Sequence, residues 1–289
     1  ALGLAQATLC PLSLRGQSAA GGQPAAQADR GAEDGAVRLS FYQIDDYLTC
    51  PYKYRFAHIL KIPLLPHHNI IYGKAVHDAI AFYFRRRLDN MEASVDEVLG
   101  VFNASWRSEG FLSKGHENER FSSGVETLRR FYAAGGEFTP VAVEKEFSIE
   151  AGESLLKGRW DIIVNRGNGD FIIDFKTSDV RDAKKAAKKA KESLQLKLYT
   201  LAYKTAFQKF PAGCALYFVE SGISGETSFG QKEMDNTLSV IAQVSEGVRK
   251  RAFNATPDYR NCSWCAFNNI CSEKLNPLRG HKNATMVSQ

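Results

Sequence analysis

Hydrophobic and polar residues follow one another along this chain with two periods, one typical of helices and one typical of strands. A coarse pass predicts helices over residues 41–49, 74–88, 95–107, 120–134, 181–208 and 235–253. Alternation, or runs rich in β-branched and aromatic residues, predicts strands over residues 141–149, 155–165, 170–176 and 215–220. Helices placed around a short central run of strands predict an α/β fold.

The segment GRWDIIVNRGNGDFIIDFKTS, residues 158–178, predicts a β-hairpin. Two hydrophobic runs flank the turn-forming residues NRGNG. Such a hairpin brings Asp161 and Asp174 close together. Because side chains alternate between the two faces of a strand, Asp174 and Lys176 share one face while Phe175 packs on the other. We therefore expect two carboxylates and an ammonium group in one pocket.

Two carboxylates and a lysine in one pocket suit metal-dependent hydrolysis of phosphodiesters. A hard divalent ion such as Mg2+ takes oxygen ligands and keeps open positions for a phosphate oxygen and a water. The ion acidifies the attacking water and offsets charge on the leaving oxygen, and Lys176 can orient that water or stabilise the charged transition state. The alternative is an ordinary surface salt bridge between Asp174 and Lys176 at the end of a strand.

Three motifs in this region, GRWD, IIDFKTS and QLKLY, resemble the PD-(D/E)XK nuclease superfamily, and specifically its RecB-like branch. The resemblance implies a restriction-endonuclease-like fold, in which helices flank a central mixed sheet. It implies a metal-binding role for Asp161, a D/E-x-K pair made by Asp174 and Lys176, and a Q-x-x-x-Y helix. Gln195 and Tyr199 belong to that helix, and their i, i+4 spacing places both on one helix face.

The RecB-like branch also has metal ligands upstream of the hairpin. A histidine in IYGKAVHDAIAFYFRRR, His77, precedes Asp161 in the order and at the distance that the resemblance implies. The alternative for His77 is a core or surface residue of an amphipathic helix. Within the strand VAVEKEFSIE, Glu144 is the candidate ligand, and Glu146 on the same face is the second choice. Both glutamates can equally be solvent-facing strand residues.

Four cysteines form a second candidate centre. Cys262, Cys265 and Cys271 have the spacing C-x2-C-x5-C, and Cys50 stands far upstream. Four thiolates suffice for one metal centre, and the spacing fits Zn2+ as well as an iron–sulfur cluster. The resemblance to AddAB-type helicase-nucleases and CRISPR-associated exonucleases, with one early cysteine and a late triplet, implies a [4Fe-4S] cluster. A disulfide pair with free thiols is the alternative.

Such a centre joins the N-terminal and C-terminal segments of the domain, because Cys50 and Cys262 are far apart in the sequence. Closing a long loop restricts the unfolded chain, and metal binding becomes folding free energy. The remaining cysteines, Cys10 and Cys214, have no comparable partners. We expect them to be a linker thiol and a buried strand residue.

The net charge of +5, from 37 lysines and arginines against 32 aspartates and glutamates, permits nucleic-acid binding without requiring it. A lysine-rich segment, RDAKKAAKKAKES, lies on the predicted helix after the hairpin and contains Lys184, Lys185, Lys188, Lys189 and Lys191. These lysines can bind a phosphate backbone or form an ordinary solvated helix face. The runs YKYRF and RRR can contact unpaired bases, although such residues pack in cores more often.

Composition divides the chain into three predicted parts. Residues 1–37 are small, polar and poor in aromatic residues, which predicts a flexible linker. Residues 38–277 form the RecB-like nuclease domain, and residues 278–289 form a polar tail. Because the chain begins with alanine, we expect a processed or excised piece of a longer protein, and the resemblance implies a UvrD-type helicase motor in cis or in trans. The sequence has no G-x-x-x-x-G-K-[ST] loop, so we expect no ATP hydrolysis by this chain.

No apolar run approaches ~18 residues and no convincing secretory signal opens the chain. We therefore expect no membrane partner and a reducing, cytoplasmic location. The favoured function is a DNA nuclease that uses Mg2+ or Mn2+, acting as an exonuclease on single strands or DNA ends in repair or recombination. The alternatives are a non-catalytic iron–sulfur DNA-binding module of a repair complex, and a structural iron–sulfur or zinc protein. Cleavage polarity, exonuclease against endonuclease action and preference for DNA over RNA are not encoded in these motifs.

Overall fold

The computed structural model describes residues 36–134 and 138–275 of the 289-residue chain. Most of the predicted linker, the predicted polar tail and Cys10 lie outside the described residues. The helices are α1 Phe41–Thr49, α2 Pro51–Tyr54, α3 His68–Leu88, α4 Val95–Ser105, α5 Lys114–Ala134, α6 Ala183–Glu192, α7 Leu194–Phe207, α8 Gln231–Arg249 and α9 Tyr259–Ser263, with a π-helical turn at Arg55–Ile59. The strands are β1 Val37–Leu39, β2 Thr139–Ala151, β3 Ser154–Asn165, β4 Asp170–Lys176, β5 Gly213–Phe218 and β6 Ile223–Thr227.

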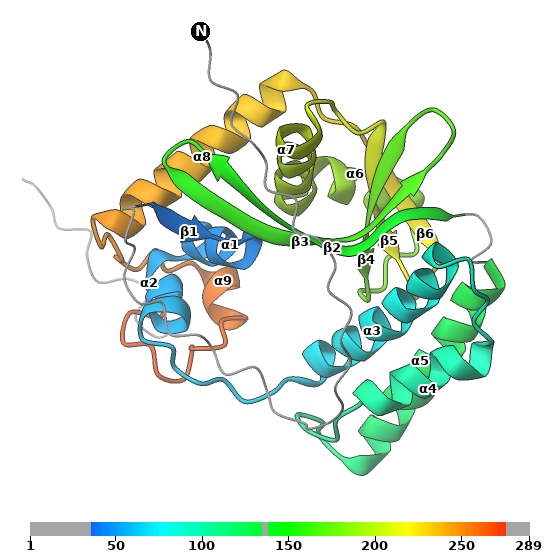
Figure 1. The fold of residues 1–289 in the computed structure, drawn as a ribbon. Helices are drawn as coiled ribbons and strands as arrows, with labels where there is room; N and C mark the ends of the chain where they lie inside the picture. The colour runs from blue at the N-terminus through cyan, green and yellow to red at the C-terminus, as the bar shows by residue number, and fades with distance from the viewer. Residues whose placement is uncertain (1–35, 135–137, 276–289) are drawn as a thin grey trace, which may run out of the picture. The chain divides into compact units, whose positions relative to one another are not determined.

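The strands form one mixed six-stranded sheet (Figure 1). Its order is β1-β3-β4-β5-β6, and β2 pairs with β3 as well. The pairs β1–β3 and β4–β5 are parallel, whereas β2–β3, β3–β4 and β5–β6 are antiparallel. A mixed sheet with helices on both faces confirms the predicted α/β class.

Helices cover both faces of the sheet and bury two hydrophobic cores (Figure 1). On one face, α1, α6, α7 and α8 pack around Trp160, which is fully buried. On the other face, α3, α4 and α5 enclose Phe84 and Phe131, whose rings contact Phe175 of β4. The hairpin therefore lies between the two layers of helices.

Most predicted elements are present, but several differ from the predictions in extent or were not predicted. The predicted helix over 181–208 is wrong as a single element, because the Ser193 backbone is extended and its side chain accepts a hydrogen bond from the Leu196 amide, which starts α7. Helices α3 and α5 each begin six residues before their predicted starts, at His68 and at Lys114. Strands β1 and β6 have no counterpart among the predictions. In β6, Gly225 lies against the backbone of Ala186 in α6, where a Cβ atom would overlap, and such a strand lacks the hydrophobic alternation that prediction uses.

The two long strands exchange faces near their middle. In β3, Trp160 packs in the core beneath α7, whereas Ile162, two residues later, packs in the core beneath α3. In β2, Phe147 belongs to the first core and Val143 contacts the second. Residues separated by an even number normally share a face. The regular alternation is therefore interrupted in both strands at the same level of the sheet.

Candidate active site

One edge of β3 is only partly covered by other strands. Strand β2 pairs along the whole opposite edge, from Ser154 to Asn165. On the partly covered edge, β1 pairs with residues 154–156 and β4 pairs with residues 162–165. Among the described residues, no strand pairs with 157–161 on this edge. A cavity of ≈ 560 Å³ lies here, lined in part by this uncovered segment.

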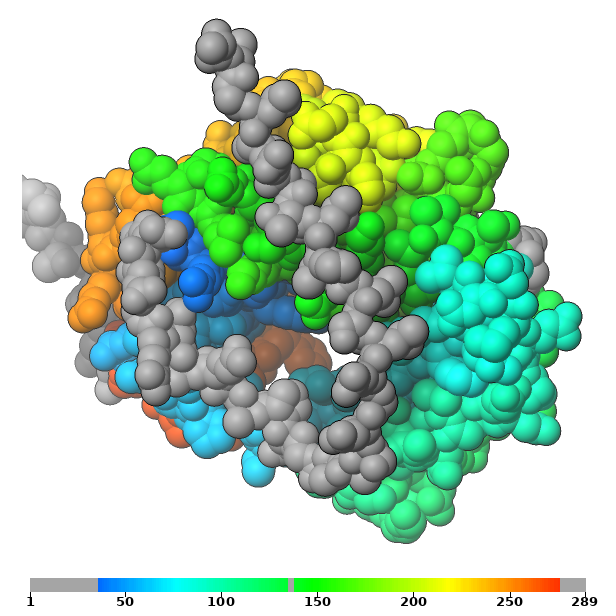
Figure 2. Space-filling view, viewed as in Figure 1, coloured from blue at the N-terminus to red at the C-terminus, as the bar shows by residue number. Residues whose placement is uncertain are grey.

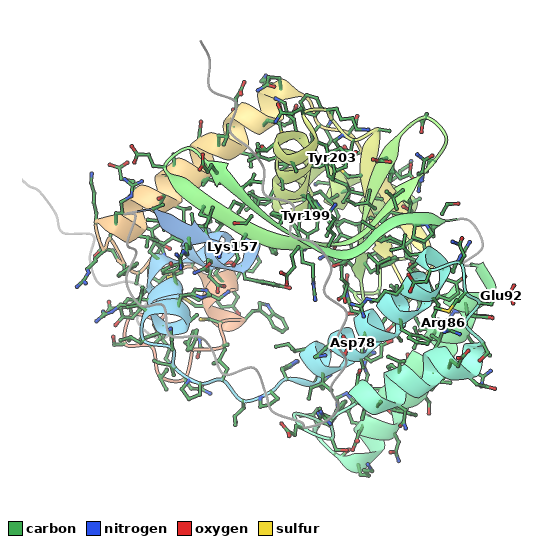
Figure 3. The ribbon with its side chains drawn as sticks, viewed as in Figure 1. Asp78, Arg86, Glu92, Lys157, Tyr199 and Tyr203 are labelled. Atoms are coloured by element: carbon green, nitrogen blue, oxygen red, sulfur yellow. The ribbon has the colours of Figure 1, made fainter. Side chains whose placement is uncertain are left out.

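The space-filling view is hollowed between the cyan helix α3 and the blue and orange segments of the chain (Figure 2). Figure 3 labels three residues that line the cavity: Lys157 of β3, Tyr199 of α7 and Asp78 of α3. The first two lie on the sheet side, and Asp78 lies on the facing helix. The cavity is therefore enclosed by the sheet, by α7 and by α3.

The predicted hairpin is present and brings its two aspartates together. Strands β3 and β4 are antiparallel with Ile162 opposite Ile173. Beyond this pair β4 leaves β3, and the amide of Phe175 donates a hydrogen bond to Asp161 Oδ2 at 3.0 Å. Asp174 is 1% exposed. Where the two strands separate, the Asp161 carboxylate therefore accepts a backbone hydrogen bond that the carbonyl of a paired strand would otherwise accept.

Lys176 and the start of α7 complete this part of the site. Lys176 Nζ lies 2.6 Å from Asp174 Oδ2 and donates a hydrogen bond to Gln195 Oε1 at 2.7 Å. Gln195 Nε2 donates in turn to the Tyr199 hydroxyl at 2.8 Å. The Trp160 indole donates to the Tyr199 carbonyl at 3.1 Å, which fixes α7 against β3. A chain of polar contacts thus runs from Asp174 to Tyr199.

His77 enters the cavity from α3. Its Nδ1 atom is 3.4 Å from Asp161 Oδ2, and its ring packs edge-on against Phe175. Burial lowers the pKa of His77 below its ordinary value and outweighs the opposing effect of the Asp174 charge. The imidazole is therefore neutral at neutral pH, which is the form that binds metals.

Glu144 also lines the cavity, but both of its oxygens are engaged by arginines. Oε2 pairs with Arg85 of α3, and Oε1 lies 3.1 Å from Arg159 Nη2 of β3. The backbone of Glu144 has φ +45°, which residues with a side chain rarely adopt. Strain of this kind persists where the surroundings hold it in place. Glu146 is exposed and is not among the residues that line the cavity.

The electrostatics of the site are dominated by two buried carboxylates beside one ammonium group. Burial and the neighbouring Asp174 raise the pKa of Asp161 to about 7. Burial alone lowers the pKa of Lys176, but the charge and hydrogen bond of Asp174 reverse this and raise it above its ordinary value. Burial and the two aspartates raise the pKa of Tyr199 well above 10. Lys176 is therefore charged and Tyr199 is neutral at neutral pH.

The donor set suits a hard divalent cation in part. Asp174 Oδ2 is buried and, apart from its close ion pair with Lys176, has no hydrogen-bond partner of good geometry. Two facing carboxylates are oxygen donors of the type that Mg2+ and Mn2+ prefer. However, the described residues contain no group of three or more histidine, cysteine, aspartate or glutamate side chains placed to hold a metal ion. The arrangement therefore offers two carboxylate donors and leaves the other positions to water or substrate.

The four cysteines of the second candidate centre line a separate cavity of ≈ 210 Å³. Cys50, Cys262, Cys265 and Cys271 are all free of disulfides. Burial raises the pKa of Cys271, and the other three thiols raise it further through their charges. At Cys50 the effect of burial is outweighed by hydrogen bonds from Thr256 and nearby backbone amides, so that its pKa is lowered.

Protein contacts already join the two segments that carry these cysteines. The Tyr47 hydroxyl donates to the Ala252 carbonyl at 2.8 Å, and Phe56 packs against the buried Phe267. Cys214 lies elsewhere, buried on β5, which confirms the prediction for that residue. Burial raises its pKa to about 12. Cys214 is therefore an inert core thiol.

The lysine-rich segment is the exposed face of α6. Lys184, Lys185, Lys188, Lys189 and Lys191 are exposed, and Ala186 and Ala190 form the buried face of the helix. None of these lysines lines the candidate active-site cavity. The structure thus places these lysines outside the cavity that the hairpin residues line, although the two segments are close in the sequence.

Sequence reasoning missed two residues that line the cavity, Arg159 and Tyr42, and one, Arg85, that binds the lining residue Glu144. Arg159 stands next to Trp160 and had no signal apart from its charge, and Arg85 appeared only as part of a basic run. Tyr42 lines the cavity although its side chain is 70% exposed. Its position beside the helix cap at Ser40 was the available clue, because residues of a first helical turn lie close to the preceding strand.

The chain belongs to the PD-(D/E)XK nuclease superfamily, whose family model matches residues 38–272. Members of this superfamily generally use Mg2+ or Mn2+. The chain is similar to the Gene 69 protein of Mycobacterium phage D29, with 23% identity over 267 residues, covering 80% of this chain and 95% of that protein. It is also similar in structure to a candidate exonuclease from Eubacterium rectale, with a TM-score of 0.49, 12% identity, and coverage of 89% of this chain and 97% of that one.

Among the described residues, no helix is both long enough and apolar enough to cross a membrane.

Proposed function

We propose that this chain is a metal-dependent deoxyribonuclease that hydrolyses phosphodiester bonds as an exonuclease on single strands or DNA ends. The family membership supports a nuclease. The observation that carries the proposal is the convergence of Asp161, Asp174 and Lys176 at the uncovered edge of β3. A surface salt bridge, the alternative, does not account for an aspartate that is 1% exposed.

In this proposal Asp161 and Asp174 hold Mg2+ or Mn2+, with neutral His77 beside them as a further ligand. Bound there, the ion would acidify the attacking water and offset charge on the leaving oxygen. When the ion is absent, burial and then repulsion from Asp174 raise the pKa of Asp161. Glu144 has a supporting role, because its two arginine partners occupy the oxygens that a ligand would use.

Lys176 positions the reacting groups. Its ammonium group is held by Asp174 on one side and by Gln195 on the other, and Gln195 is held by Tyr199. An ammonium fixed in this way can orient the attacking water or stabilise charge on the phosphate in the transition state. Gln195 and Tyr199 therefore act through Lys176, and removing either should loosen it without removing its charge.

We further propose that Cys50, Cys262, Cys265 and Cys271 hold a [4Fe-4S] cluster, with Zn2+ as the less favoured occupant. All four line one cavity, which supports a shared centre, although within the described residues they are not placed to hold a metal ion together. The centre would cross-link the segment that follows α1 to the segment that contains α9, in addition to the existing contacts between these segments. Purified protein should show visible absorbance and about four iron atoms per chain, and Cys262→Ser should lose both. Stoichiometric zinc without iron would contradict the cluster.

The same proposal includes a RecB-like nuclease domain at residues 38–277, DNA as the partner, and a helicase motor in cis or in trans. The exposed lysines of α6 form a surface that can bind a phosphate backbone outside the active site. Repair and recombination are the processes in which such a helicase-nuclease would act.

A non-catalytic iron–sulfur DNA-binding module is the second candidate. One observation favours it: Lys176 and the arginines bound to Glu144 occupy carboxylate oxygens, and no three-ligand group exists among the described residues. A functioning site must therefore rearrange these contacts when metal and DNA bind. If it does not, the chain binds DNA without cutting it.

The test is incubation of the purified protein with end-labelled single-stranded and duplex DNA, in Mg2+, Mn2+ or EDTA. Metal-dependent degradation that is lost in Asp174→Ala and Lys176→Ala is expected. Glu150→Ala, at an exposed position of β2, is the matched control and should cut normally. Binding without cleavage by folded protein in all metals would support the second candidate, and cleavage that survives in Asp174→Ala would refute the assigned site.

A further inference from the structure

A second cavity, of ≈ 600 Å³, adjoins the candidate active-site cavity at the end of β4. The two cavities share Asn69 and Thr177 as lining residues. Thr177 directly follows Lys176 in the chain. A strand of nucleic acid that places one phosphate beside Lys176 can therefore place another in the neighbouring cavity.

The second cavity carries an excess of positive charge. Arg120 and Arg130 of α5 line it together with Arg181, against the two carboxylates of Asp179 and Glu220. Asp179 pairs with Arg181 at 3.0 Å. Three guanidinium groups and two carboxylates give the lining a formal net charge of one positive unit.

Glu220 is occupied by neutral donors. Its carboxylate accepts hydrogen bonds from the Tyr72 hydroxyl and, at 3.0 Å, from the Thr127 hydroxyl. Arg130 binds elsewhere on the same residue, because it donates to the Glu220 carbonyl at 3.1 Å and to Thr127 Oγ1 at 3.0 Å. These contacts fix the wall of the cavity without neutralising Arg120.

Arg120 and Arg130 both lack an ion pair with a carboxylate of the described residues, and of the two only Arg130 is held by hydrogen bonds. The Arg120 guanidinium lies over the Tyr72 ring, with Cζ 4.0 Å from the ring centroid. Its Nε atom is buried without a hydrogen-bond partner. The Nδ1 atom of His68, which lines the same cavity, is also buried and unpartnered. Buried polar groups normally have partners, so two in one cavity indicate a site for a polar ligand.

We propose that this second cavity, the Arg120 cavity, binds a phosphate group of the same nucleic-acid strand whose scissile phosphate lies beside Lys176. A guanidinium matches the geometry of phosphate oxygens, and its stacking on Tyr72 holds it ready for them. The hydroxyls of Thr177 and Ser178 line the same cavity and can donate to the remaining oxygens. The inference rests on the proposed nuclease function. The phosphate is either an internal phosphodiester or the terminal phosphate of the strand.

The test compares Arg120→Gln and Arg120→Lys with Arg129→Gln, a control on the exposed face of the same helix. Binding is measured without cleavage, in EDTA, by fluorescence anisotropy of single-stranded oligonucleotides that carry a 5′-phosphate, a 3′-phosphate or hydroxyl ends, over a range of KCl. Cleavage by the same variants is measured in Mg2+. Thermal melting establishes that each variant is folded.

We expect Arg120→Gln to weaken binding about tenfold and to lower the slope of log affinity against log salt by about one. Arg120→Lys should keep the slope and recover part of the affinity. In cleavage, the change should fall on KM and leave kcat largely intact. Equal losses for all oligonucleotides indicate an internal phosphate, and a loss confined to one end chemistry indicates a terminal phosphate.

Affinity and salt dependence of Arg120→Gln equal to those of Arg129→Gln would overturn the inference. A different result would show that the proposed nuclease function is wrong: wild-type protein would then bind oligonucleotides without cutting them in any metal. Binding in EDTA reports on the Arg120 cavity in either case.

Discussion

Replacing Asp161 by Asn should stabilise the metal-free protein at alkaline pH while removing its response to metal. Burial and Asp174 raise the pKa of Asp161 from its ordinary 3.8 to about 7. Each pH unit corresponds to about 1.4 kcal/mol, so that ionising Asp161 in the folded state costs up to about 4 kcal/mol. Asn keeps an acceptor for the Phe175 amide, but the bond is weaker by about 1 kcal/mol because the charge is lost. We expect a gain of about 2–3 kcal/mol, or ~6–9 °C in Tm for a domain of this size.

The pH dependence has a definite sign. Between pH 3.8 and about 7 the folded protein keeps a proton on Asp161 that the unfolded chain has released. The contribution of Asp161 to the stability of the wild type therefore falls as pH rises through this window. The advantage of Asp161→Asn should be absent near pH 4 and complete near pH 8.

The assay is thermal unfolding of metal-free wild type, Asp161→Asn and Glu150→Gln, at pH 5 and pH 8, with and without Mg2+ or Mn2+. Metal that binds the folded state at a hundred times its Kd adds about 2.7 kcal/mol. We expect this gain in wild type and in the Glu150→Gln control, and a much smaller one in Asp161→Asn. The same Tm difference at both pH values would refute the raised pKa of Asp161. An equal metal response would refute Asp161 as a ligand.

Two further predictions concern the fold. Gly225→Ala should destabilise the domain by about 2 kcal/mol, because the added Cβ overlaps the Ala186 backbone. Gly100→Ala, inside α4 with open space around it, should be neutral or stabilising by up to ~1 kcal/mol. Equal effects of the two substitutions in chemical denaturation would contradict this packing. Hydrogen bonds from Lys114, Ser108 and Trp106 lower the pKa of Glu117 to about 2. Wild type should therefore lose its stability advantage over Glu117→Gln as pH falls from about 4.5 towards 2, and a Tm difference that is constant with pH would contradict it.

The hairpin and its chemistry were predictable because the information is local. Residues Asn165 to Gly169 form a turn in which Gly167 and Gly169 have positive φ, and the Asn165 side chain accepts from the Gly167 amide at 2.8 Å. Such a turn fixes which strand residues face one another. The proximity of Asp161 and Asp174 followed from that register.

Contacts between distant segments were not predictable from local patterns. The arginines that bind Glu144 come from α3 and β3, and neither position has a periodic or motif signal. The exchange of faces in β2 and β3 also breaks the alternation on which strand prediction depends. The role of Glu144 as a metal ligand stays a prediction, and only the structure shows that two arginines engage its side chain.

The position of the site follows from the shortness of β1. This strand covers only three residues of β3 before Ser40 ends it. The Ser40 hydroxyl accepts from the Gln43 amide while the Gln43 side chain accepts from the Ser40 amide, a capping box that commits the next residues to α1. A longer β1 would cover residues 157–161 of β3 and fill the space in front of Asp161. The S-x-x-Q sequence at 40–43 thus leaves uncovered the edge of β3 at which the carboxylates and Lys176 meet. The helix cap therefore helps to form the site, although it contacts no reacting group.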